Sequence, residues 1–334
     1  MQLSIIIVNY NAKKFITDCI NSALQFISAK KFEWIIVDNN SSDDSKKILT
    51  TVFPFIRWID MGYNSGFARA NNAGILQSKS DVVLLLNPDI IIVDDCIRKC
   101  LEKFTSDNAI ACSVQLINPD GSPQITGNYF MKGGLNHLLP LPYLGKALRN
   151  IAFLFKSHTT NVLKANEYET VDWINGAFLM VKKSAIQKVG LMDEDFFLYG
   201  EEVEWCARLR KYGELVVYGN LTTLHLQGEI INTETNTAGK GYFDLYSKKG
   251  LQLIISNNLR IRKQYGVAWF FFNVVIYILE IPVFCICSFI NNIIYLRNPF
   301  KEWKKILSYA KNVCTLIFLA PKIISKKNFF YKMI

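Results

Sequence analysis

The chain has 334 residues, half of them hydrophobic, and a formal net charge of +10 at pH 7. That length suits one large α/β domain with an appendage. The eight cysteines form no CxxC pair, and no histidine lies beside them at zinc-ligand spacing, so neither a disulfide framework nor a structural zinc is indicated.

The positive charge lies in the C-terminal part of the chain. Residues 1–239 hold 23 Lys and Arg against 25 Asp and Glu, whereas residues 240–334 hold 15 against 3 and so carry +12. A basic segment can bind nucleic acid or anionic lipid. Because these basic residues flank an aromatic and aliphatic stretch, we predict an anionic membrane surface as partner and no nucleic acid.

The first 110 residues alternate strand patterns with helical ones. Short apolar runs predict strands at residues 3–8, 32–37, 57–60 and 81–86. Apolar residues at helical spacing predict helices at residues 13–28, 45–51, 66–77 and 94–104. This alternation predicts an α/β fold with a doubly wound, mostly parallel sheet.

The pattern weakens between residues 112 and 168, where residues 131–155 are rich in Gly, Pro and Leu and show no clear period. We interpret this part as a variable insertion in the fold. Order returns with a predicted strand at 171–181, helices at 183–189 and 201–212, and a strand at 214–218 that continues as strand or loop through His225.

The aromatic and aliphatic stretch at residues 267–296 is long enough to cross a bilayer. However, Glu280 lies in its middle with Pro282 close behind, and a carboxylate at mid-bilayer costs a few kcal/mol. Basic residues lie on both sides, at Arg260, Arg262, Lys263, Arg297, Lys301, Lys304 and Lys305. We therefore predict two half-length helices in one leaflet. The alternative is two ordinary helices packed on the rest of the chain or on a second subunit.

Two predicted strands end in carboxylates, Asp38 after the second strand and Asp89 after the fourth. An open parallel sheet binds its ligand at the carboxyl ends of its strands. Carboxylates placed there need a partner that favours negative charge, most simply a base or ribose donor and a divalent cation. The pattern predicts a sugar-nucleotide site, although Asp38 alone also fits a polar strand-to-helix loop.

Five motifs in order resemble the glycosyltransferase family 2 enzymes and, within them, the rhamnosyltransferase-like branch. They are Val8–Asn11, Val37–Ser41, Asn64–Ala68, Asn87–Asp89 and Phe196–Trp205. The resemblance covers residues 1 to 230 and implies a GT-A fold and inverting transfer from a nucleoside-diphosphate sugar. It divides the chain into a GT-A domain at 1–239, with a nucleotide-binding part at 1–110 and an acceptor-side part at 111–239, and a basic, membrane-associating helical region at 240–334.

The predicted donor-binding residues are Asn9, Asp38, Asn64, Gly66, Arg69, Asn72 and Asn87. The loop at 64–72 combines a glycine with amide side chains at the start of a helix. Backbone N–H groups and the helix dipole favour a pyrophosphate or its sugar there. Arg69 adds positive charge, or is a solvated helix residue.

The resemblance also implies a divalent metal, Mg²⁺ or Mn²⁺. Residues 87–89 occupy the position of the Asp-x-Asp metal motif of the family, with Asn87 in place of the first Asp. Asp89 supplies the hard anionic oxygen that these cations prefer. Related enzymes place a metal-binding histidine where this chain has His225, although a lone histidine is more often structural.

Inverting transfer needs one base that removes a proton from the acceptor hydroxyl. The family has Glu-Asp where this chain has Glu201 and Glu202, which implies that Glu202 is the base and that Glu201 lies on the acceptor side. Both are also the acids that a helix N-terminus favours. Asp193, Glu194 and Asp195 remain alternative bases.

Trp173, Asn175 and Gly176 resemble the acceptor-side loop of the family, although such a glycine also marks a bulge. The membrane-seeking tail implies a lipid-linked saccharide acceptor. Because the sequence opens on a strand pattern, we expect the protein at the cytoplasmic face of the cell membrane, bound peripherally or monotopically.

Two other classes of function stay open. A nucleotidyltransferase would carry a Gly- and Lys/Arg-rich first loop, and residues 9–11 contain neither. A non-catalytic glycan-binding membrane protein would share the fold, but the carboxylate positions of the proposed site are still acidic.

Overall fold

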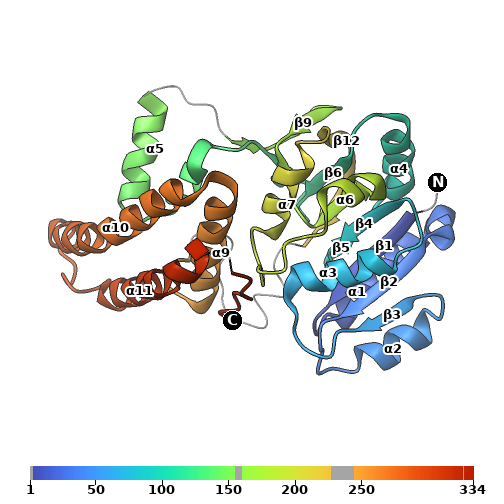
Figure 1. Ribbon diagram of the computed structural model, residues 1–334, viewed down its shortest axis with the longest axis horizontal. Helices are drawn as coiled ribbons and strands as arrows, with labels where there is room; N and C mark the ends of the chain where they lie inside the picture. Colours follow the sequence, from blue (N-terminus) through green and yellow to red (C-terminus); the bar gives the residue numbers. More distant parts are fainter. Residues whose placement is uncertain (1–2, 155–159, 227–243, 326) are drawn as a thin grey trace. The chain divides into compact units, whose positions relative to one another are not determined.

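The computed structural model describes residues 3–154, 160–226, 244–325 and 327–334. The chain divides into two compact units (Figure 1). The first contains Met1–Tyr129, Asn161–Phe197 and Glu201–Thr237, and the second contains Phe130–Thr160, Leu198–Gly200 and Ala238–Ile334. Sequence analysis places all of residues 111–239 in one part, whereas two internal segments of that range pack with the C-terminal helices.

In the described residues, a sheet of nine strands forms the centre of the first unit, in the order β3-β2-β1-β4-β11-β6-β12-β5 with β9 added on β12. Its strands are β1 (Leu3–Asn9), β2 (Glu33–Asp38), β3 (Arg57–Asp60), β4 (Val82–Leu86), β5 (Ile90–Ile91), β6 (Ala111–Ile117), β9 (Glu169–Val171), β11 (Phe178–Lys182) and β12 (Leu215–His225). Strands β1 to β4 pair in parallel, β11 is antiparallel to β4 and β6, and β12 is parallel to β6. The predicted mostly parallel α/β sheet is confirmed.

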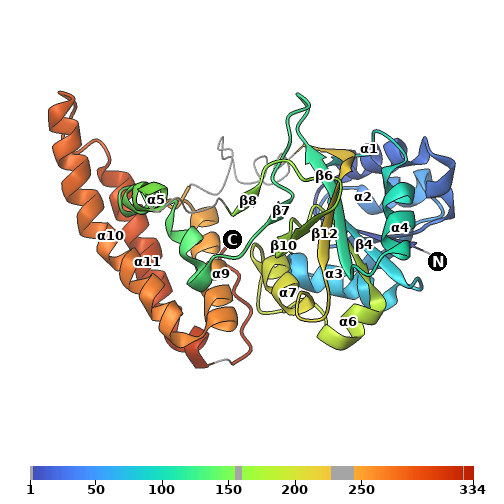
Figure 2. The same ribbon diagram turned by 90° about the horizontal axis from the view of Figure 1, so that it is seen from above.

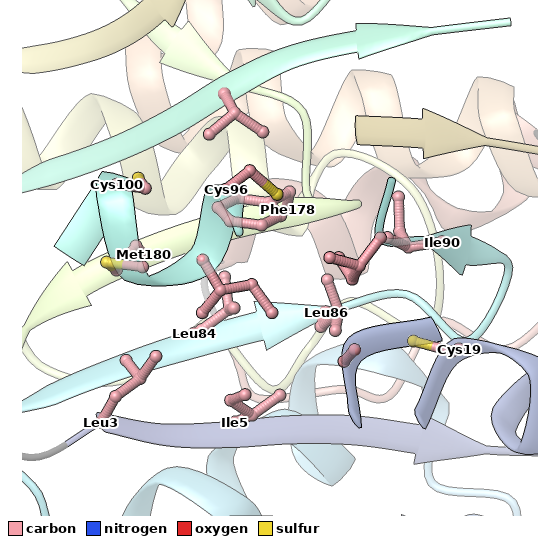
Figure 3. Close-up of a cluster of buried hydrophobic side chains, with 14 of the residues drawn as sticks. Leu3, Ile5, Cys19, Leu84, Leu86, Ile90, Cys96, Cys100, Phe178 and Met180 are labelled. Carbon is pink, nitrogen blue, oxygen red and sulfur yellow. The ribbon is translucent and has the colours of Figure 1, made fainter. Parts of the chain in front are cut away.

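Both faces of this sheet are covered by helices, which explains why β1 is a continuous apolar run. On one face lie α1 (Lys13–Leu24), α2 (Ser45–Val52) and α4 (Cys96–Ser106). On the other lie α3 (Gly66–Gln77), α6 (Lys183–Val189) and α7 (Glu201–Leu209). Figure 3 shows the first of these cores, where Cys19 of α1 and Cys96 and Cys100 of α4 lie among side chains of the strands. The cysteines there are small, buried packing residues.

Strand β6 was not predicted, because its sequence is interrupted by polar residues. Ser113 and Gln115 are both buried in it. Gln115 Nε2 donates to Gln124 O at 2.7 Å, and Gln115 Oε1 accepts from Ala165 N at 2.9 Å. Buried polar side chains are tolerated where they are hydrogen-bonded, so β6 does not show the apolar run of a central strand.

Two further boundaries differ from the prediction. The expected strand at 171–181 is broken at residues 175–177, and its middle part, β10 (Trp173–Ile174), pairs with β7 (Gly127–Asn128) in a separate three-stranded sheet that ends in β8 (Asn161–Val162). The predicted helix at 13–28 ends at Leu24 and is followed by a 3₁₀ helix, η1 (Ile27–Lys31).

The second unit is helical. It contains η2 (Lys132–Leu138), α5 (Leu144–Leu154), α9 (Lys248–Tyr265), α10 (Val267–Ile294) and α11 (Trp303–Ser325), and both views show α10 and α11 side by side (Figures 1 and 2). Two half-length helices at 267–296 are therefore wrong. Pro282 removes one hydrogen bond inside α10, but packing along α9 and α11 holds α10 as one helix.

Candidate functional site

Asp38 lies at the carboxyl end of β2, directly beside Asn9 at the end of β1. Asn9 Nδ2 donates to Asp38 Oδ1 at 2.8 Å and to Ser41 Oγ at 3.0 Å, and Ser41 N donates to Asp38 Oδ2 at 3.1 Å. Asp38 retains 8% exposure, whereas Asn9 has none. Asn9 therefore orients the carboxylate of Asp38.

Asn39, which the sequence did not single out, connects the end of β2 to the loop at 64–66. Its Nδ2 donates to Asn64 Oδ1 at 3.1 Å and to Gly66 O at 3.2 Å. Its Oδ1 accepts from both the backbone N and the Oγ of Ser65, each at 2.7 Å. The run of short polar residues after β2 was the only signal for this role. Asn64 is half-buried and stays at the site.

Gly66 starts α3 in the left-handed region, at φ 75°. A Cβ on Gly66 would lie 2.3 Å from the carbonyl oxygen of Phe197, a distance that real Cβ atoms do not reach. The next residue, Phe67, donates its N–H to the same carbonyl at 2.9 Å. Only glycine therefore lets the start of α3 approach the segment that precedes the acidic helix.

Two other predicted donor residues face that same segment. Asn72 Nδ2 donates to Met192 O at 2.9 Å, and Asn72 Oδ1 accepts from Met192 N at 3.0 Å. Arg69 Nε donates to Glu194 O at 3.1 Å. With 2% exposure, Asn72 holds the 192–194 segment against α3.

Asp89 and His225 lie together, as the metal prediction requires. Strand β5 begins at Ile90, which is the register partner of His225 at the end of β12. Asp89 Oδ1 lies 3.4 Å from His225 Nε2, and both side chains are 6% exposed. The buried Cys19 thiol lies near this carboxylate: burial raises the pKa of Cys19, and the charge of Asp89 raises it further. Asn87 is half-buried, and its N–H donates to Ala177 O at 2.9 Å.

Gln124 fixes the proton on the His225 ring. Its Nε2 donates to His225 O at 2.7 Å and to Asn118 Oδ1 at 2.8 Å, so its Oε1, 2.8 Å from His225 Nδ1, is an acceptor. Nδ1 therefore carries the hydrogen. In the neutral ring Nε2 then turns a lone pair toward Asp89, an arrangement that is stable only with a proton or a cation between the two groups. No sequence pattern pointed to Gln124.

This donor set fits a divalent cation. Within the described ranges, no three His, Cys, Asp or Glu side chains form a metal-binding group. One carboxylate and one imidazole are the ligands that a cation shared with a diphosphate needs from a protein, because phosphate oxygens and water complete the coordination. The ring nitrogen opposite the ligand is held by Gln124, as in metal-binding histidines generally.

The acidic helix α7 carries the predicted base. Glu201 is buried and Glu202 is half-buried in its first turn. A Cβ built on Gly176 would lie 3.6 Å from Cβ of Glu202, so the predicted acceptor-side loop and the base are neighbours. Trp173 and Asn175 are half-buried beside Gly176 in the chain.

Other acids nearby have structural partners. Arg208 Nε donates to Glu204 Oε1 at 2.8 Å, and the Arg208 guanidinium also donates to the carbonyls of Val189 and Leu191. Asp193 Oδ1 accepts from the N–H of Asp195 at 3.0 Å, which closes a turn before α7. These contacts hold the frame around Glu202.

Residues 4–169 match the model of the family described as Glycosyl transferase family 2. This match covers the N-terminal half of the chain. Among curated proteins, it is 30% identical over 218 residues to the low-salt glycan biosynthesis hexosyltransferase Agl10 of Haloferax volcanii. The match covers 63% of this chain and 62% of Agl10, so the chain spans less than two thirds of the length of that relative.

Solved structures support the same fold. GalNAc-T7, solved with UDP, GalNAc and Mn²⁺, has a TM-score of 0.51 at 15% identity, over 81% of this chain and 56% of that one. The mannosyltransferase PcManGT of Pyrobaculum calidifontis, solved with GDP-Man and Mn²⁺, has a TM-score of 0.50 at 11% identity, over 94% of this chain and 86% of that one. At these identities the likeness concerns the fold, which is the expected GT-A type.

We expect Gly66→Ala to destabilise the first unit far more than Gly62→Ala, which makes the two a matched pair. Both glycines have φ 75°, but a Cβ on Gly62 meets nothing within 4 Å. Gly62→Ala therefore costs only the left-handed conformation, about 1–2 kcal/mol, while Gly66→Ala adds the collision with Phe197. Urea unfolding measures the difference, and equal midpoints for the two variants would contradict the close approach.

Proposed function

We propose that this protein is an inverting, metal-dependent glycosyltransferase that moves a sugar from a nucleoside-diphosphate sugar to a lipid-linked saccharide in cell-surface glycan synthesis. The observation that carries the proposal is the placement of Asp38, Asp89 and His225. Strands β2, β4 and β12 run in the same direction through their pairings, so all three residues lie at one edge of the sheet. That edge is where open α/β sheets bind nucleotides.

In this proposal, Asp38 accepts hydrogen bonds from the base or the ribose of the donor. Its two oxygens are held by Asn9 and Ser41, so its orientation is fixed before the donor arrives. A bound cation, held by Asp89 and His225, would neutralise the departing diphosphate. The short loop at 64–66, which is held by Asn39, would border the bound donor.

Glu202 is the proposed base. It would remove the proton of the acceptor hydroxyl as that oxygen attacks the anomeric carbon, and the bond from that carbon to the diphosphate breaks on the opposite face. Its neighbour Gly176 belongs to the proposed acceptor-side loop, and a Cβ built there would lie 3.6 Å from Cβ of Glu202.

For the donor we propose a hexose or deoxyhexose, with rhamnose first because the motifs resemble the rhamnosyltransferase-like branch. The hexosyltransferase Agl10 supports the wider class. Incubation with a panel of nucleotide sugars, followed by measurement of released nucleoside diphosphate, tests the function as a whole. No release from any member of the panel would overturn it.

Chelation is expected to abolish turnover, because the diphosphate would leave without a compensating charge. Excess EDTA should stop transfer, and added Mn²⁺ or Mg²⁺ should restore it. Gln124→Leu, which frees the His225 ring, should raise the metal concentration for half-maximal activity about 10- to 100-fold. Mn²⁺ binding followed by electron paramagnetic resonance measures the same change without turnover. Full activity in EDTA would refute the metal requirement.

Glu202→Gln is expected to lower the rate of transfer by about two to four decades, the usual effect of losing a general base. Binding of the nucleotide sugar, measured by calorimetry, should be unchanged. Glu201→Gln is the matched control, because it alters the neighbouring carboxylate. If Glu202→Gln is nearly as active as the unaltered protein while Glu201→Gln or Asp195→Asn is inactive, the base is assigned to the wrong residue.

We propose a membrane surface as partner because α10 buries several polar side chains and exposes many large apolar ones. Its buried positions include the polar side chains Asn273, Glu280, Ser288 and Asn292. Its exposed positions include Phe271, Phe272, Val275, Ile278, Leu279, Ile286, Phe289, Ile290, Ile293 and Ile294. A helix in water buries its apolar face, so this outward face suits an apolar medium.

The buried charge of α10 is compensated inside the unit. Glu280 Oε1 accepts from Tyr143 N and Glu280 Oε2 accepts from Leu144 N, each at 2.9 Å, where α5 begins. The carboxylate therefore caps the N-terminus of α5 and does not face lipid. Among the described residues, α10 and α11 are long and apolar enough, by length and composition, to cross a membrane.

The connection between α10 and α11 favours one leaflet over a crossing. It includes Leu296, which is 96% exposed, and the exposed aromatic residue Phe300, and it leads into the exposed Trp303 at the start of α11. It also holds the basic residues Arg297 and Lys301, and Lys304 and Lys305 follow at the start of α11. Each contributes about 1 kcal/mol near an anionic surface, and together they oppose transfer to the far side. We propose that the second unit binds the cytoplasmic face.

Placing two acids on the outward face of α10 should release the protein from lipid. For Ile286→Glu with Ile290→Glu, we expect at least about tenfold weaker sedimentation with vesicles that contain phosphatidylglycerol, because two charges replace apolar side chains. Ile27→Glu, at an exposed site of the first unit, is the control and should bind normally. An unaltered protein that washes off these vesicles in plain buffer would contradict the proposal.

A further inference from the structure

The small sheet of the first unit arranges its side chains in two rows. Strand β7 lies between β10 and β8 (Figure 2). The register of the three strands gives one row of Ile174, Gly127 and Val162. The next row, which we call the amide row, consists of Trp173, Asn128 and Asn161. Because residues directly opposite one another share a face and successive residues alternate, the two rows point to opposite faces of this sheet.

The row of Ile174, Gly127 and Val162 faces the core of the first unit. Ile174 is fully buried, and Val162 packs against the same cluster of apolar side chains. A Cβ on Gly127 would lie 2.5 Å from Cγ1 of Val171, which belongs to that cluster. The amide row therefore points away from this core, although the large ring of Trp173 still reaches it and is half-buried.

Asn128, in the centre of the amide row, has a buried N–H group without a partner. The residue is 3% exposed, and its Nδ2 has no hydrogen-bond partner in the part of the chain that the structure describes. Most buried donors are bonded, because a donor that loses water without a replacement destabilises the fold. A ligand that carries hydrogen-bond acceptors would satisfy this donor.

The neighbours of Asn128 in the row indicate the chemistry of that ligand. Trp173 presents a partly exposed indole ring, and the exposed Asn161 presents a second amide. Neighbouring strands lie about 4.8 Å apart, so the three side chains extend over roughly 10 Å. A pyranose fits such a row, because the C–H groups of its ring contact an aromatic face and its hydroxyls accept and donate hydrogen bonds.

The small sheet lies beside the proposed base. Helix α7, which carries Glu202 in its first turn, packs against β10. Gly176, two residues after the end of β10, is a neighbour of Glu202. The proposed donor residues Asp38 and Asp89 lie at the end of β2 and after β4, which belong to the central sheet. The small sheet is therefore placed to bind the acceptor.

We propose that the amide row binds a pyranose of the acceptor saccharide. Asn128 Nδ2 donates a hydrogen bond to one hydroxyl of this sugar, and Trp173 contacts its ring. Asn128 is then a specificity-determining residue, because a site that bonds a hydroxyl strongly rejects the analogue that lacks it. The inference rests on the proposed function, since it takes the acceptor to be a saccharide.

The first test measures binding of simple sugars without any donor. The probes are the methyl pyranosides of glucose, galactose, mannose, N-acetylglucosamine and rhamnose, and saturation-transfer NMR measures their binding. We expect the unaltered protein to bind at least one of them. Asn128→Leu should weaken that binding at least about tenfold, because no N–H remains for the hydroxyl. Asn108→Leu, the same change at an exposed position of the first unit, is the control and should bind normally.

Deoxy analogues of the bound pyranoside identify the hydroxyl that Asn128 recognises. One analogue should bind the unaltered protein at least about tenfold more weakly than the parent sugar, and Asn128→Leu should bind that analogue and the parent equally. Trp173→Phe, which keeps an aromatic face, should bind the parent sugar more tightly than Trp173→Leu does.

Unfolding in urea separates a ligand-binding amide from a structural one. Because Nδ2 of Asn128 has no partner among the described residues, Asn128→Leu should leave the urea midpoint unchanged or raise it. Gln115→Leu is the matched comparison, because the buried amide of Gln115 is bonded at both ends. Its midpoint should fall.

Three results would overturn the proposal. The first is binding of the pyranosides by Asn128→Leu as tightly as by the unaltered protein. The second is a urea midpoint of Asn128→Leu as low as that of Gln115→Leu, which would show that a buried water or another part of the fold bonds the amide. The third is no binding of any pyranoside by the unaltered protein, even if it transfers sugar. If pyranosides bind through Asn128 but no nucleotide sugar is turned over, the proposed function fails and the saccharide site stands.

Discussion

A carboxylate at the end of a buried strand is stable only where hydrogen-bond donors or cations surround it. In this protein the donors around Asp38 are neutral: the amide of Asn9 and the backbone N–H of Ser41. Asp89 faces the imidazole of His225. The contacts of Asn39, Gln124 and Gly66 hold the carboxyl ends of these strands, and with them the two carboxylates, in a fixed arrangement.

The sequence predicted the parts of this arrangement that depend on local pattern. The helix Gly66–Gln77 and the strand Arg57–Asp60 have the predicted bounds, because period and turn residues define both ends. The meeting of Asp89 with His225 was predicted through a family resemblance. Its physical cause is the pairing of β5 with the end of β12, which no local pattern contains.

What the sequence could not predict depends on partners far apart in the chain. Gln124 looks like an ordinary loop residue until β12 places His225 beside it. Asn72 and Asn9 have the composition of ligand-binding residues, but their amides are taken up by backbone and side chains of the fold. Glu280 looks like a charge in a membrane span because its partners, the N–H groups of α5, lie 136 and 137 residues away. In each case the residue type indicated a polar role, but the hydrogen-bond partner, which lies far away in the chain, determined what that role is.

The bonds between Glu280 and the start of α5 also bear on how the chain matures on the ribosome. Residues 130–160 leave the ribosome well before α10 is made, since 136 residues separate Leu144 from Glu280. At roughly 5–20 residues per second, that interval lasts about 7 to 30 seconds. During it, β11 and β12 can complete the central sheet, while α5 still lacks the carboxylate that caps it. Residues 130–160 therefore leave the ribosome several seconds before Glu280 is synthesised. In that interval a chaperone or the membrane surface can bind them.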